Sequence, residues 1–88
     1  MPYIEQDSRL GFDAPISELK PEKAGELNYV ISRICADYSA RKGKKYSNLN
    51  EVMGVLTCVA QEFYRRIAAP YEDEKIRENG DIKGYENA

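Results

Sequence analysis

The sequence contains no histidine and only two cysteines among its 88 residues. Histidine is the commonest general base and nucleophile-activating partner, so its absence argues against the usual catalytic dyads and triads. Cys35 and Cys58 are isolated thiols without a CxxC spacing, which makes them poor zinc ligands. Both lie in apolar helical patterns, where a free cysteine is typically a small core residue.

The sequence also lacks a glycine-rich phosphate loop and the HExxH motif of metalloproteases. Helical nucleotide hydrolases hold Mg²⁺ with pairs of acidic residues one helical turn apart, because this ion prefers hard oxygen ligands. Glu78 and Asp81 have that spacing, but Gly80 interrupts the helix between them. We therefore predict a non-enzymatic protein with no catalytic residue, no metal site and no cofactor.

No hydrophobic run approaches the roughly 20 residues that a membrane helix needs. The first residues, MPYIEQDSRL, are acidic and polar and do not have the pattern of a signal peptide. These absences predict a cytoplasmic protein that does not bind membranes. Because a chain this short buries only a modest fraction of its surface, we also expect it to gain stability as a homo-oligomer.

An excess of positive charge is missing, since 13 basic residues face 15 acidic ones and the net charge is −2. Residues 71–88 hold six acidic and three basic side chains, whereas cations cluster in the loop RKGKK and at Arg65 and Arg66. A generic DNA-binding domain is normally far more basic, so we do not expect nucleic acid as a partner.

The hydrophobic pattern predicts an all-α fold in which two long helices form an antiparallel hairpin within a single domain, residues 1–88. The first long helix is expected at 22–40, where one stripe repeats with a period of 3.6 residues. Its members are Leu27, Val30, Ile31, Ile34, Cys35 and Tyr38. Before it, residues 1–21 are expected to form short helical turns at 3–10 and 16–20, because prolines and a glycine punctuate this segment.

The second long helix is expected at 48–69, with Asn48 or Ser47 as its N-cap. Its stripe consists of Leu49, Val52, Met53, Leu56, Ala60, Phe63 and Ile67, and Val55 and Val59 widen it. This broad face is either covered by the N-terminal turns or forms a subunit interface. Pro70 is expected to end or kink the helix, which leaves a short helix at 71–79, a stop at Asn79-Gly80 and a tail at 81–88.

Seven polar and aromatic residues are candidates for a ligand-binding site on this hairpin. In an antiparallel arrangement, the end of the second helix would approach the start of the first. Arginine grips phosphate, tyrosine stacks on a base and asparagine reads hydrogen-bonding edges, so the set suits a small nucleotide-like anion. The candidates are Asn28, Tyr29, Arg33, Asn50, Arg65, Arg66 and Tyr71. The competing interpretation pairs Arg65 and Arg66 with the acidic run 72–74, which would make them structural.

Four blocks carry a family resemblance: MPYI, GELNYVISRI, SNLNEVMGVLTCVAQEFYRR and APYEDEKIRENGD. Together they resemble a small all-helical family of unknown function from prokaryotes and tailed phages. The resemblance implies no activity, but it implies a prokaryotic cytoplasm, or the host cytoplasm if a phage encodes the chain.

Some small phage proteins of unknown function are compact oligomers that sequester nucleotide immune signals, and this chain is similar to them in size and residue types. The leading hypothesis is therefore an oligomeric protein that sequesters a small nucleotide-like anion, as a phage inhibitor of immune signalling. The alternative is a protein–protein interaction module that inhibits or scaffolds a host protein, using the broad face of the second helix and the acidic tail.

Overall fold

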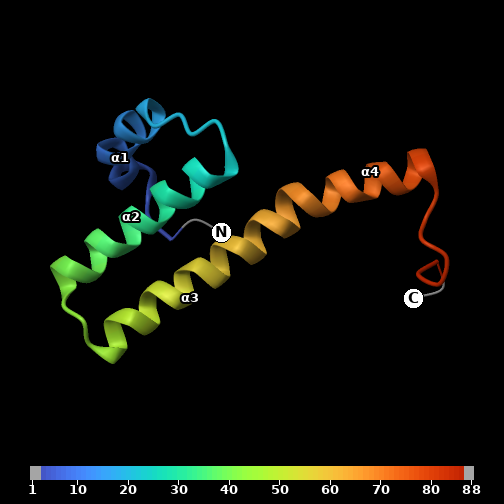
Figure 1. Ribbon diagram of the computed structural model, residues 1–88. Helices are drawn as coiled ribbons and strands as arrows, with labels where there is room; N and C mark the ends of the chain where they lie inside the picture. The colour runs from blue at the N-terminus through green and yellow to red at the C-terminus, as the bar shows by residue number, and fades with distance from the viewer. Residues whose placement is uncertain (1–2, 87–88) are drawn as a thin grey trace. The chain divides into compact units, whose positions relative to one another are not determined.

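The computed structural model of the chain describes residues 3–86, and within this range the protein is all-α, with no strand. This confirms the predicted fold class. Four α-helices and one π-helical turn follow one another along the chain (Figure 1). They are α1 (Gln6–Glu18), α2 (Ala24–Lys42), α3 (Tyr46–Phe63), η1 (Tyr64–Ala68) and α4 (Ala69–Asn79).

Internal contacts divide the chain into two compact units, which we describe separately. The N-terminal unit, Met1–Val52, contains α1, α2 and the first two turns of α3. The C-terminal unit, Met53–Ala88, contains the rest of α3, then η1 and α4.

The N-terminal segment forms one helix, α1, where we predicted two separate turns. This helix has 13 residues and holds Pro15 in its interior. A proline removes one hydrogen bond and crowds the carbonyl group of the residue four positions before it. Here that residue is Gly11, whose backbone adjusts most readily. The helix therefore continues past the proline and ends where the Leu19 N–H donates to the Ile16 carbonyl.

Helix α2 lies two residues later than predicted at both ends, at 24–42 instead of 22–40. The Glu26 carboxylate accepts a hydrogen bond from the backbone N–H of Glu22 at 2.8 Å, which satisfies a donor just before the helix. Gly43, with φ of 100°, ends the helix in a conformation that a side chain would disfavour.

The chain reverses direction in the short connection between α2 and α3, as predicted. The Asn48 amide donates to the backbone carbonyls of Lys42 and Gly43, at 3.0 Å each, and so ties the start of α3 to the end of α2. The predicted N-cap role of Asn48 is wrong, because α3 already begins at Tyr46. Nearby, the Tyr38 hydroxyl donates to Glu51 at 3.4 Å, so the first turns of α3 run back beside the end of α2.

In the C-terminal unit, α3, η1 and α4 follow without a break, so the helix does not end at Pro70. The predicted helix 48–69 is divided into α3 and η1, and the predicted helix 71–79 starts earlier, at Ala69. The backbone N–H of Ala69 donates to the carbonyl of Tyr64, five residues back, which is the bond of a π-turn. Because Pro70 has no N–H, this wider turn lets the chain pass it while remaining helical. Gly80, with φ of 84°, ends α4, which confirms the predicted stop.

Neither unit has a buried core, because no side chain among the described residues is buried. Cys35 is only half-buried and Cys58 is exposed, so neither is the core residue that the sequence predicted. The stripe on α3 is likewise largely uncovered: Met53 is 63% exposed and Phe63 is 61% exposed.

Candidate functional site

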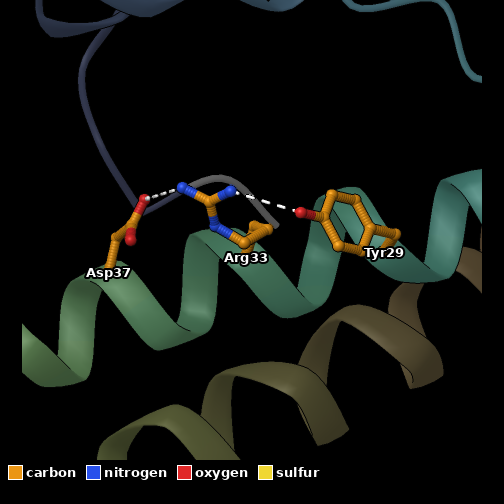
Figure 2. A network of polar contacts seen from close by, with 3 residues as sticks. All are labelled: Tyr29, Arg33 and Asp37. Atoms are coloured by element: carbon orange, nitrogen blue, oxygen red, sulfur yellow. Dashed lines mark hydrogen bonds and ion pairs between the residues drawn. The ribbon is translucent and has the colours of Figure 1, made fainter.

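Three side chains on α2 form a polar row along one face of the helix (Figure 2). The Arg33 guanidinium donates to the Tyr29 hydroxyl at 3.3 Å. On its other side it pairs with the Asp37 carboxylate, with 3.8 Å between nitrogen and oxygen. The three residues are spaced four apart, so the helix repeat places them one above the other. Two of the seven candidates, Tyr29 and Arg33, are therefore in contact, and Asp37 joins them.

Asp37 changes what this row can bind. The hydrogen bond to Tyr29, followed by the charge of Asp37, raises the pKa of Arg33 above its ordinary value. The guanidinium is thus a permanent cation, but an incoming anion has to share it with a carboxylate. The arginine and aspartate side chains are 59% and 56% exposed, so solvent screens this ion pair and a ligand can reach it.

The other two candidates of the N-terminal unit do not join this row by a hydrogen bond. Asn28 accepts a hydrogen bond from the Ser32 hydroxyl at 3.4 Å on the same helix. Asn50 is exposed on α3. The remaining candidates, Arg65, Arg66 and Tyr71, belong to the C-terminal unit. That all seven converge on one ligand therefore stays a prediction.

In the C-terminal unit, Arg66 pairs with Glu62 on the preceding turn, at 3.1 Å. The competing interpretation, in which the arginines pair with the acidic run 72–74, is wrong for both. Within residues 53–86, neither Arg65 nor Arg66 forms an ion pair with that run. Glu72 of the run instead accepts a hydrogen bond of 2.6 Å from the Tyr64 hydroxyl.

Tyr71 is engaged by a cation rather than left open for a stacking base. The Lys75 ammonium lies 5.4 Å from the centre of the Tyr71 ring, and it also pairs with Glu78 at 3.5 Å. A ligand that stacks on this face of the ring would have to displace the lysine.

Two hollows in the C-terminal unit escaped the sequence analysis. One is a groove of about 290 Å³ along α3 and η1, and it is lined by Val59, Glu62, Phe63, Arg66 and Ile67. We call this set the α3 groove. The sequence pattern assigned Val59, Phe63 and Ile67 to the apolar face of the second long helix. It did not place the charged Glu62 and Arg66 on the same surface.

The second hollow, of about 460 Å³, lies between α4 and the segment that follows it. Gly80 and Gly84, with φ of 84° and 102°, turn this segment, and the Tyr85 N–H donates to the Ile82 carbonyl at 3.0 Å. The sequence contains a signal that residues 81–86 fold back. Two glycines permit the turns, and Ile82 and Tyr85 are apolar residues in a segment that is otherwise polar. The wall of this second hollow includes Tyr64, Glu72, Lys75, Ile76 and Asp81.

Residues 1–82 match the model of a family that is described as a domain of unknown function, DUF6899. The chain belongs to the DUF6899 family. The match includes every helix of the described structure, so it confirms the resemblance to a family of unknown function. No curated protein and no solved structure matches the chain.

Among residues 3–86, no group of three or more histidine, cysteine, aspartate or glutamate side chains is placed to hold a metal ion. None of the helices in this range combines the length and apolar character required to cross a membrane.

Proposed function

We propose that this DUF6899 chain is a non-enzymatic protein-interaction module that binds a helix of its partner along the α3 groove. The observation that carries the proposal is the exposure of the groove's apolar side chains in a unit without a core. Val59, Phe63 and Ile67 are 57%, 61% and 58% exposed, and they lie at the spacing of one helical face.

The energetics favour an occupied groove. Ordering the backbone costs about 1–2 kcal/mol per residue, which folded domains offset largely by burying apolar side chains. Burying a fully exposed Val, Ile or Phe contributes about 1.5–3 kcal/mol. Roughly half of that gain is still unrealised at each of the three positions, so a partner helix that covers the groove stabilises the unit as it binds.

The partner in this proposal is a protein, and the role that fits is inhibition or scaffolding of a host protein. The setting we propose is a prokaryotic cytoplasm, or the host cytoplasm if a phage encodes the chain. Both thiols are free, which suits a reducing compartment.

Two matched phenylalanine substitutions test this proposal. Phe63 in the groove and Phe12 on α1 are 61% and 60% exposed, so they differ in place and not in exposure. We expect Phe63→Asp to abolish association of the purified chain with itself or with a captured protein, as measured by light scattering and affinity capture. Phe12→Asp should leave association unchanged. Equal behaviour of the two variants, or a chain that associates with nothing, would overturn the proposal.

A second candidate function, sequestration of a small nucleotide-like anion, is favoured by the contact between Tyr29 and Arg33. A ring and a guanidinium that touch on an exposed face offer stacking and phosphate binding at one place. Calorimetric titration with a nucleotide panel tests it, with Arg33→Gln as the variant and Arg41→Gln, on the same helix, as its control. Binding that both variants retain, or hydrolysed nucleotide after release by heat, would contradict this function.

A further inference from the structure

The α3 groove is complementary to itself, and this points to what occupies it. Its apolar floor is flanked by one acid and one base, Glu62 and Arg66, which are four residues apart and pair at 3.1 Å. We propose that the groove binds the same groove of a second copy of this chain, with the two helices antiparallel. This inference rests on the proposed function and names its partner.

Charge selects the antiparallel orientation. Two copies related by a two-fold axis make an interface in which each residue contact occurs twice. With the axis level with Tyr64, midway between the two charged positions, Glu62 of each copy faces Arg66 of the other. A parallel pairing in register would instead put this flank of the two helices on opposite sides of the interface, so Glu62 and Arg66 of one copy would not meet those of the other.

The apolar side chains fit the same register. In it, Phe63 of one copy lies at a level between Phe63 and Ile67 of the other, because antiparallel helices run through the sequence in opposite directions. A side chain inserted between two residues of the facing helix is the packing that paired helices use. The helical part of the C-terminal unit, from Met53 to Asn79, is about 40 Å long at 1.5 Å per residue, which gives such a pair room to form.

Charge reversal tests the inference. Glu62→Arg leaves two bases on each flank and Arg66→Glu leaves two acids, so each variant alone should dimerise about tenfold more weakly than the natural chain. Mixing the two variants should restore the affinity, because every base then faces an acid. Sedimentation equilibrium measures the affinities, and circular dichroism verifies that each variant keeps its helix content.

The double variant Glu62→Arg/Arg66→Glu tests the orientation. In the antiparallel dimer it remains self-complementary, so it should pair with itself and exclude the natural chain, which mass spectrometry of isotope-labelled mixtures detects. Random mixing with the natural chain would show that Glu62 and Arg66 do not face each other across the interface, as in a parallel pair, and would overturn the inference. A chain that stays monomeric at its highest soluble concentration would also overturn it. If Phe63→Asp then still blocks binding of a different protein, the proposed function stands and only the second copy is wrong.

Discussion

At the scale of single residues, the hydrogen bond between Tyr64 and Glu72 depends on the conformation of the backbone between them. The two residues are eight positions apart and their side chains meet at 2.6 Å. In a regular α-helix of 3.6 residues per turn, they would point about 80° apart around the axis. The π-turn at Tyr64–Ala68 holds more residues per turn, so it brings the two side chains into line.

This hydrogen bond predicts how Tyr64 titrates. Donation to Glu72, followed by the negative charges of Glu72 and Asp73, raises the pKa of Tyr64 above its ordinary value. Only the protonated phenol donates, so its contribution to stability is fully present below the ordinary tyrosine pKa of about 10 and is lost as the pH rises through the raised pKa. We expect an NMR titration to give Tyr64 a midpoint above about 10.

The matched variants for this titration lie on α4. Glu72→Gln removes the charge that opposes the tyrosinate and should lower the Tyr64 midpoint. Glu74→Gln, which changes the net charge equally but is not among the causes of the shift, should leave it in place. A midpoint that responds equally to both substitutions would show that overall charge, and not this contact, raises the pKa.

The candidate site was partly predictable at this scale. The contact between the candidates Tyr29 and Arg33 follows from their i, i+4 spacing, because such pairs are set by the helix repeat alone. The same rule applied to acids would have found Asp37 beside Arg33 and Glu62 beside Arg66. These acidic neighbours were not among the candidates, because the candidates were groups that bind phosphate. A neighbouring acid nevertheless determines whether an arginine is already neutralised.

At the scale of elements, Pro70 determines the form of the last helix. Pro70→Ala restores a backbone donor and removes the ring that crowds the preceding turn. We expect the π-turn to revert to α-helix, with a gain in helical circular dichroism. Because the reverted turn rotates α4, the Tyr64–Glu72 hydrogen bond should break and the raised pKa of Tyr64 should fall.

The control for this substitution is Ala69→Gly, which disturbs the same turn without restoring a donor. It should reduce helix content, since glycine is about 1 kcal/mol less favourable than alanine within a helix. If Pro70→Ala keeps the Tyr64–Glu72 contact in NMR spectra, the π-turn arises from another cause than the proline.

Periodicity predicted the elements of this chain better than its punctuation residues did. The stripes at a period of 3.6 residues located α2 and α3 within a few positions, because amphipathic spacing is set by the helix itself. Prolines and a glycine were expected to divide residues 1–21 into short turns, and Pro70 to end or kink the second long helix. Instead Pro15 lies inside α1, and Pro70 follows a π-turn in a continuous helix. A proline removes one hydrogen bond, and adjustable neighbours decide whether the helix survives that loss.

At the scale of the whole molecule, the proposed dimer makes a prediction about stability. Within residues 3–86 no side chain is buried in either unit, and the proposed dimer would cover apolar area that a small domain otherwise buries in its own core. When folding and dimerisation are coupled, mass action links thermal stability to protein concentration. For the proposed dimer, stability measured at one concentration would then describe the pair and not the single chain.

This linkage gives a direct prediction. A tenfold rise in concentration corresponds to about 1.4 kcal/mol of association free energy per dimer, and because two chains of 88 residues unfold together this raises the melting temperature by roughly 3–6 °C. Thermal melts followed by circular dichroism at several concentrations measure it. Phe63→Asp should lower the melting temperature and remove its dependence on concentration, because the groove then no longer binds a second copy. Phe12→Asp should retain that dependence, and a natural chain that melts at one temperature at every concentration would show that it is stable without association.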